Sequence, residues 1–202
     1  MRRDPGESNL KDYLFFPLVL IVAILMVLGS IMVGANAPQC GPFGGADGPA
    51  DYSFATIKGQ NLCRMEGRKG YELQLANDIL TIRGEAEENY GELVRSPQFK
   101  LGADLETVYA GQKLTISLQV KPTEGAGAMA FEAMYSTGKA GNSGWQRFDL
   151  IPDWQTYQFE YQVPEKLLEN TVAYDYFAVR PVVPEKVRGI MIREIEFRRA
   201  GF

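Results

Sequence analysis

Apolar and polar residues alternate with a period of two along several segments of the second two-thirds of the chain. Alternation over about four to eight residues is typical of a β-strand that buries one of its faces. In 113–120, for example, Leu114, Ile116 and Leu118 fall on one face, and polar residues fall between them. The predicted strands are YELQLAN (71–77), KLTISLQV (113–120), AMAFEAMYS (128–136), WQTYQFEYQV (154–163), YDYFAVRPVV (174–183) and GIMIREIEF (189–197).

Short segments rich in Gly, Pro and Asn separate these strands, as expected of an antiparallel sandwich. They include AGQK (110–113), PTEGAG (122–127) and GKAGNSG (138–144). The one helical pattern in this part, EKLLEN (165–170), is too short to form a layer. We therefore predict an all-β fold of two packed sheets.

A different pattern occupies 14–34, where 21 consecutive residues carry no charge. About 20 apolar residues are needed to cross a hydrocarbon core of about 30 Å, so we predict a transmembrane helix. A cleaved signal peptide is the alternative, because ANA (35–37) resembles a cleavage site. Pro38 would then be the first residue after the cut, which is unfavourable, and the apolar run is longer than in most signal peptides.

Basic residues predict how the helix is oriented. Arg2, Arg3 and Lys11 precede the apolar run, and no Lys or Arg follows until Lys58. We therefore expect a single-pass protein of the bacterial inner membrane, with a cytoplasmic N-terminus and a periplasmic C-terminal domain. The predicted parts are a tail (1–13), the helix (14–34), a Gly/Pro-rich linker (35–52) and the β-sandwich (53–202).

The chain has two cysteines, Cys40 and Cys63. In an oxidising compartment they are expected to form a disulfide that ties the linker to the first strands. Two free, half-buried thiols are the alternative. Neither cysteine belongs to a CxxC motif and the chain contains no histidine, so we expect no zinc site.

Within the predicted helix, Ser30 and Gly34 form a pair of small residues one turn apart. Such pairs allow two helices to pack closely in lipid. The expected partners are therefore the bilayer and an integral-membrane protein complex.

The absence of histidine also excludes catalysis by Ser-His-Asp or Cys-His groups within this chain. The densest acidic segment, GEAEENYGE (84–92), is interpreted as a surface loop. Catalytic carboxylates and a structural calcium site are the alternatives there. We expect no catalytic residue, no cofactor and no enzymatic activity.

Charge argues against nucleic acid as a partner. The first 13 residues carry three basic and three acidic side chains, so the formal net charge of −4 belongs to the rest of the chain. No stretch combines a basic stripe with aromatic residues, which nucleic-acid binding would favour.

Three segments together resemble the galactose-binding-like jelly rolls of carbohydrate-binding modules. They are VYAGQKLTISLQVKP (108–122), GWQRFDLIPDWQTYQFEYQVP (144–164) and VRGIMIREIEF (187–197). The resemblance covers about 97–197 and implies a two-sheet jelly-roll sandwich. It also implies glycan binding, although the same scaffold serves as a protein-interaction module.

The aromatic residues can be assigned by face and position. Alternation puts Tyr157, Phe159 and Tyr161 in the core. The resemblance implies that Trp154, at the entrance of this strand, caps the sandwich, with a ligand contact as the alternative. Flat rings beside planar hydrogen-bonding groups favour sugar stacking or a partner contact. The candidate contact residues are Trp145, Gln146, Arg147, Tyr174, Tyr176 and Arg180.

Two non-catalytic functions remain open, beside the alternative of an enzyme that acts through carboxylates. The main hypothesis is a non-catalytic accessory subunit whose sandwich docks on an inner-membrane complex of respiratory or photosynthetic type. The alternative is a membrane-tethered carbohydrate-binding module for envelope polysaccharide.

Overall fold

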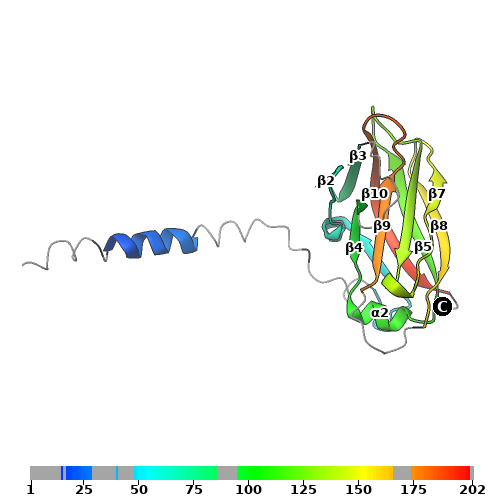
Figure 1. Cartoon of the computed structure of the whole chain (residues 1–202), viewed down its shortest axis with the longest axis horizontal. Helices are drawn as coiled ribbons and strands as arrows, with labels where there is room; N and C mark the ends of the chain where they lie inside the picture. The colour runs from blue at the N-terminus through cyan, green and yellow to red at the C-terminus, as the bar shows by residue number, and fades with distance from the viewer. Residues whose placement is uncertain are drawn as a thin grey trace, which may run out of the picture. The chain divides into compact units, whose positions relative to one another are not determined.

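The chain divides into two compact units, Met1–Gln39 and Cys40–Phe202. In the first unit, residues 17–28 form a helix (Figure 1). The side chains of this helix are exposed. The computed structural model describes residues 15, 17–28, 40, 48–85, 95–165 and 174–200.

No helix within this described part combines the length and apolarity that a membrane crossing requires. Residues 14, 16 and 29–34 of the predicted span lie outside the described residues, and these include both Ser30 and Gly34. The predicted tail (1–13) and most of the predicted linker lie outside them as well.

The second unit is a sandwich of two antiparallel sheets, as the alternating pattern predicts (Figure 1). One sheet has six strands in the order β2-β3-β10-β5-β8, with β1 also paired to β10; the other has the order β4-β9-β6-β7. The strands of the first sheet are β1 (Phe54–Lys58), β2 (Tyr71–Ala76), β3 (Ile79–Gly84), β5 (Lys113–Pro122), β8 (Gln155–Gln162) and β10 (Arg188–Arg199). Those of the second are β4 (Gln98–Lys100), β6 (Ala130–Ser136), β7 (Gln146–Asp149) and β9 (Tyr176–Pro181).

β10 is the centre of the six-stranded sheet. Its first half pairs with β3, its second half with β1, and its other edge pairs with β5. A register shift interrupts the β5 pairing between Ile192 and Glu194. A bulge at this point lets Ile192 and Ile195 both face the core although two residues lie between them, a spacing that would put them on opposite faces of a regular strand, and it leaves Arg193 on the outer face.

The core lies between the two sheets and follows the alternation in the sequence. On β5, Leu114, Ile116, Leu118 and Val120 are all 0% exposed. The sheets meet through aromatic rings such as Phe177 of β9 and Phe197 of β10, whose centroids lie 5.3 Å apart, edge to face. Edge-to-face packing of this kind adds about 1 kcal/mol beyond the area that the rings bury.

A short helix, α2 (Ala103–Tyr109), lies at one end of the sandwich and was not predicted from the sequence (Figure 1). It buries Leu105 and Tyr109 completely. Its seven residues are too few to show a helical period, since a pattern needs about 11 or more. The helix predicted around 165–170 lies almost entirely outside the described residues.

The disulfide between Cys40 and Cys63 is confirmed. It joins residue 40 to the 3-10 helix η2 (Gly59–Arg64), with the two Cα atoms 6.0 Å apart. The bridge therefore fixes the start of the second unit against β1 and η2.

Candidate functional site

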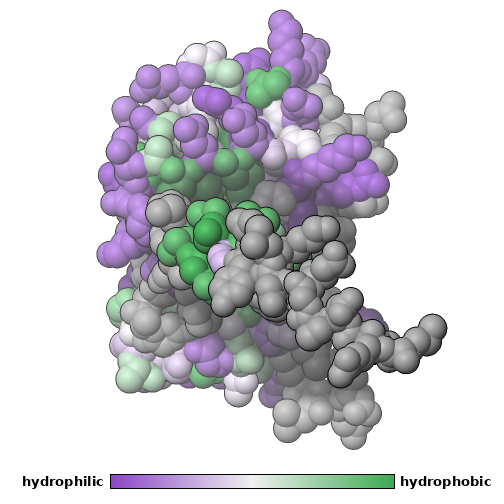
Figure 2. Space-filling view, turned by 90° about the vertical axis from the view of Figure 1, so that its left-hand side faces the viewer, coloured by the Kyte–Doolittle hydropathy of each residue, from purple (hydrophilic) through white to green (hydrophobic). Residues whose placement is uncertain are grey.

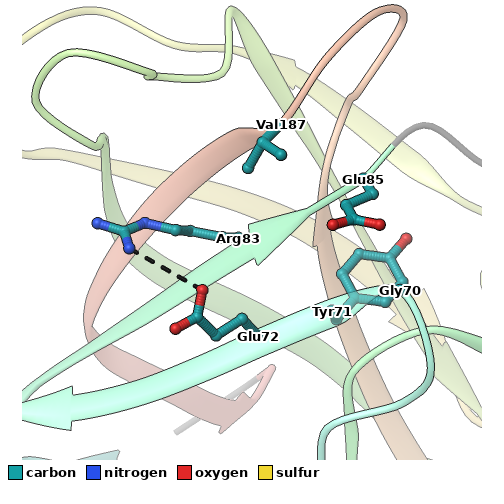
Figure 3. A pocket seen from close by; sticks show the side chains of 6 residues that line it. All are labelled: Gly70, Tyr71, Glu72, Arg83, Glu85 and Val187. Atoms are coloured by element: carbon teal, nitrogen blue, oxygen red, sulfur yellow. Dashed lines mark ion pairs between the residues drawn. The ribbon is translucent and has the colours of Figure 1, made fainter.

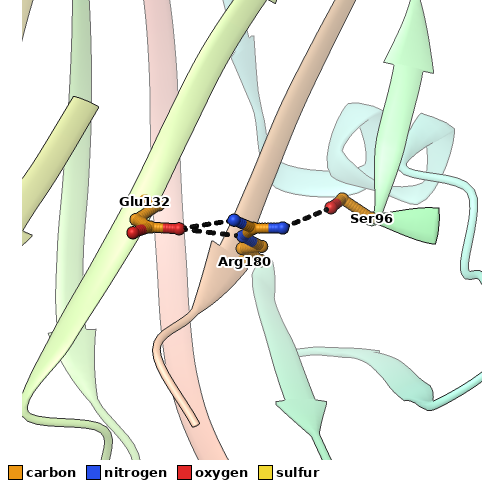
Figure 4. A network of polar contacts seen from close by, with 3 residues as sticks. All are labelled: Ser96, Glu132 and Arg180. Atoms are coloured by element: carbon orange, nitrogen blue, oxygen red, sulfur yellow. Dashed lines mark hydrogen bonds and ion pairs between the residues drawn. The ribbon is translucent and has the colours of Figure 1, made fainter. Parts of the chain in front are cut away.

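An ion pair between Glu132 and Arg180 lies on the outer face of the four-stranded sheet (Figure 4). The two residues are directly opposite each other on β6 and β9. Arg180 donates hydrogen bonds from Nε and Nη2 to Oε2 of Glu132 at 3.0 and 2.7 Å, and from Nη1 to Oγ of Ser96 at 3.3 Å. The Arg180 and Glu132 side chains are only 4% and 14% exposed. A charge buried this deeply is tolerated because it is paired and hydrogen-bonded.

Trp145 stacks on this ion pair. The guanidinium carbon of Arg180 lies 3.7 Å from the centroid of the Trp145 ring. A cation–π contact contributes about 0.5–2 kcal/mol, more when it is desolvated. Because Glu132 holds Arg180 in place, the ring of Trp145 also has a fixed position.

The loop before Trp145 is held by hydrogen bonds. The backbone of Ser143 donates to the carbonyl of Tyr135 at 2.8 Å, and Oγ of Ser143 accepts from the Tyr135 amide at 3.0 Å. The Gly144 amide donates to Oδ1 of Asn142 at 2.9 Å. Gly144 has φ +67°, a conformation that a residue with a Cβ rarely adopts. These bonds fix the approach of the chain to Trp145.

Three of the six predicted contact residues share this part of the face. Arg147 follows Trp145 by two residues, is exposed, and lies opposite Glu132 on β7. Trp145, Arg147 and Arg180 are therefore brought together. Gln146 points to the other side of the sheet, opposite Ala133, and its Nε2 donates to the carbonyl of Ser143 at 2.8 Å.

The two predicted tyrosines lie at the other end of β9. Tyr176 is on the same face as Arg180, opposite Lys100 and Ser136. Four residues along a strand correspond to about 13 Å, so Tyr176 is well separated from Arg180. Tyr174 precedes the strand, and Nζ of Lys100 lies 2.7 Å from the centroid of its ring.

Asp175, between these tyrosines, is completely buried. It accepts a hydrogen bond at 2.9 Å from the hydroxyl of Tyr135, and its amide donates to Oε1 of Glu106 at 2.7 Å. Burial, and then the negative charge of Asp175, raise the pKa of Tyr135 well above its ordinary value. Tyr135 is therefore a neutral donor that holds the start of β9 in position.

The sequence reasoning missed Glu132, Ser96, Lys100 and Asp175. A signal for the first was present, because Glu132 and Arg180 are isolated charges of opposite sign, each in an otherwise apolar strand. Such charges are rarely buried unless they are paired. Nothing in the sequence indicated, however, that β6 and β9 are neighbours.

Trp154 lies on the outer face of the six-stranded sheet, together with Lys121 and Arg193. Nζ of Lys121 and the guanidinium carbon of Arg193 are 5.3 and 5.0 Å from the centroid of its ring. The expectation that Trp154 caps the sandwich is therefore wrong. The prediction that Trp154 and Tyr157 lie on opposite faces of the sheet is confirmed, because Tyr157 packs against the core.

One hollow of about 270 Å³ touches the predicted acidic segment (Figure 3). Of that segment only Gly84 and Glu85 are described, and Glu85 lines the hollow with Tyr71, Glu72 and Arg83. Glu72 points to Arg83, whose Nη1 is 4.0 Å from its Oε2, whereas Glu85 lies near Tyr71 (Figure 3). The two carboxylates thus have different neighbours and do not face each other as a catalytic pair.

Among the described residues, no group of three or more Cys, Asp or Glu side chains could hold a metal ion. Glu87, Glu88 and Glu92, on which the calcium alternative depended, lie outside them.

Docking on a membrane complex finds no support in the surface of the sandwich. Its described residues expose only three large apolar side chains, Met129, Ile151 and Val187. In Figure 2 hydrophilic side chains cover the left edge and most of the top of the face shown, and hydrophobic side chains gather at its centre. Stable docking is usually associated with a contiguous apolar patch of several hundred Å².

No family model matches the chain. No curated protein matches it significantly either.

The chain is similar to solved structures of carbohydrate-binding modules. One is a xylan-binding domain of family 22, with 14% identity, a TM-score of 0.42, and coverage of 75% of this chain and 89% of that one. Another belongs to family 4, with 14% identity, a TM-score of 0.41, and coverage of 72% and 86%. A family 29 module from Piromyces equi has 14% identity, a TM-score of 0.40, and coverage of 72% and 80%.

Proposed function

We propose that the chain is a non-catalytic carbohydrate-binding module that holds a glycan on the outer face of the four-stranded sheet. The observation that carries this proposal is the stack of Trp145 on Arg180, whose position Glu132 fixes through the ion pair. A ring held in this way loses little conformational entropy when a ligand binds.

The surroundings of the ring have the chemistry that a sugar requires. Arg147, exposed beside Trp145, supplies planar hydrogen-bond donors. The glycan would contact the exposed end of the face at Trp145 and Arg147, because Ala178, which lies between Arg180 and Tyr176 on the same face of β9, is 0% exposed.

In this proposal the ligand is an envelope polysaccharide, and the module is exported and tethered to the membrane by residues 14–34. The disulfide between Cys40 and Cys63 supports an oxidising compartment. Binding through a tether would hold polysaccharide close to the membrane surface.

A glycan array tests the proposal. The full-length chain in mild detergent is applied to envelope and plant polysaccharides, beside Trp145→Ala, Trp145→Phe and Lys113→Ala. Trp145→Ala should weaken binding roughly tenfold, because it removes the stacking surface. Trp145→Phe should retain part of the affinity.

Lys113→Ala should bind normally, because Lys113 lies on the other sheet in an exposed ion pair with Glu160. Wild-type binding that survives Trp145→Ala unchanged would show that the site is elsewhere. No binding to any glycan would refute the function.

A further inference from the structure

The outer face of the six-stranded sheet carries a second hollow, on the opposite side of the sandwich from Trp145. Its volume is about 480 Å³. It lies where the end of β1, the turn between β2 and β3, β5 and the bulge of β10 meet. Its lining residues are Lys58, Gly59, Asp78, Gln119, Arg193 and Glu194.

The walls of this hollow have a fixed backbone. Asn77 and Asp78 have φ 51° and 61° and join β2 to β3 through a two-residue turn. Positive φ at both positions is the signature of a type I′ turn, in which Asn and Asp are favoured. Nε2 of Gln60 donates to Oδ1 of Asp78 at 3.0 Å, and this bond fixes the carboxylate against η2.

Several polar groups around the hollow have hydrogen-bonding capacity to spare. Arg193 uses Nε and Nη2 to donate to Oε1 of Gln119, at 3.1 and 2.7 Å. The amide nitrogen of Gln119 and Nη1 of Arg193 therefore remain available as donors. Lys58 and Glu194 are directly opposite each other on β1 and β10, yet neither forms an ion pair in the described part of the chain.

An aromatic ring adjoins the hollow. Arg193 lines it and also lies 5.0 Å from the ring centroid of Trp154. Lys121 of β5 also lies over this ring. A half-buried ring thus stands beside a set of donors and acceptors, which is the combination that the Trp145 face also has.

The charges indicate what kind of ligand fits. Lys58 and Arg193 would repel a cation, and Asp78 and Glu194 would repel an anion. Hydroxyl groups both donate and accept hydrogen bonds, so a neutral polyhydroxylated molecule can satisfy both kinds of residue.

We propose that this hollow and Trp154 form a second saccharide site, specific for a neutral sugar unit of a polysaccharide. This inference rests on the proposed function and deepens it. Because the outer faces of the two sheets point in opposite directions, one module with two such sites would bridge two polysaccharide chains.

Native gels that contain xylan, mixed-linkage β-glucan or galactomannan test the proposal with the full-length chain in detergent. Retardation is compared for wild type, Trp145→Ala, Trp154→Ala and the double variant. We expect each single variant to lose roughly tenfold in affinity for the retarding polysaccharide, and the double variant to run as in a gel without polysaccharide.

The outcomes separate the two proposals. If Trp154→Ala behaves as wild type while Trp145→Ala is impaired, the second site is refuted and the proposed function stands. The reverse pattern supports the second site and overturns the role of Trp145. If none of the three polysaccharides retards the wild type, the second site is overturned as well, because all three are neutral.

Two variants keep the test independent of folding. Asp78→Asn preserves the left-handed turn but removes the carboxylate, and it should weaken retardation as Trp154→Ala does. Glu160→Gln alters the same outer face far from the hollow, in an exposed ion pair with Lys113, and should have no effect. Equal effects of the two variants would contradict the proposal.

Discussion

Replacing Glu132 by Gln tests whether the buried ion pair organises the glycan face. The substitution keeps the shape of the side chain but removes the carboxylate that pairs with Arg180. The pair is largely buried, since the Arg180 and Glu132 side chains are only 4% and 14% exposed. Removing one partner of a buried pair costs about 3–5 kcal/mol. The Gln carbonyl can still accept one hydrogen bond, and Ser96 still accepts another, so we expect a loss near the lower end, about 3 kcal/mol.

The free energy of unfolding is measured by urea denaturation, followed by tryptophan fluorescence, with the m-value checked for constancy. Glu196→Gln is the matched control, because Glu196 pairs with Arg198 at the surface, where the Arg198 side chain is 46% exposed. It should cost less than about 1 kcal/mol.

A double variant, Glu132→Leu with Arg180→Met, separates charge from packing. It removes both ionised groups, and buried pairs can often be replaced by apolar residues at little cost. We expect the double variant to be more stable than Glu132→Gln. A loss below about 1 kcal/mol for Glu132→Gln, or a double variant as unstable as the sum of its single changes, would refute the reasoning.

Two further predictions concern stability. Cys63→Ser should lower the free energy of unfolding by about 3 kcal/mol, because the disulfide closes a loop with a sequence separation of 23, and a urea melt of the reduced wild type should match it. Burial and the negative charge of Asp175 raise the pKa of the Tyr135 hydroxyl in the folded protein. The free energy that this hydroxyl contributes to folding is therefore fully present below about pH 10 and is lost as the pH rises towards the folded-state pKa. In Tyr135→Phe the free energy of unfolding should therefore fall less steeply above pH 10, by up to about 1.4 kcal/mol per pH unit. An unchanged slope would contradict the raised pKa of Tyr135.

The strands and their buried faces could be predicted because each strand carries its own alternating pattern. Leu114, Ile116 and Leu118 identify the core face of β5 without knowledge of its neighbours. The disulfide could be predicted because the chain has only two cysteines.

The candidate site depends on which strands are neighbours, and a local pattern does not contain this information. Glu132 and Arg180 meet only because β6 pairs with β9. Gln146 follows Trp145 directly, and the two-residue period of the strand sends it to the opposite face. Trp154 was assigned by analogy to a cap, whereas the register of β8 and β5 places it beside Lys121.

The position of β10 in the sequence has a consequence for how the chain is made. β10 pairs with β1, β3 and β5, yet it is synthesised after all of them. Until residues 188–199 have emerged, the six-stranded sheet lacks its central strand, and its long-range pairings make folding slow. Closure of the six-stranded sheet therefore follows the emergence of β10 and is one of the last steps in the folding of the sandwich.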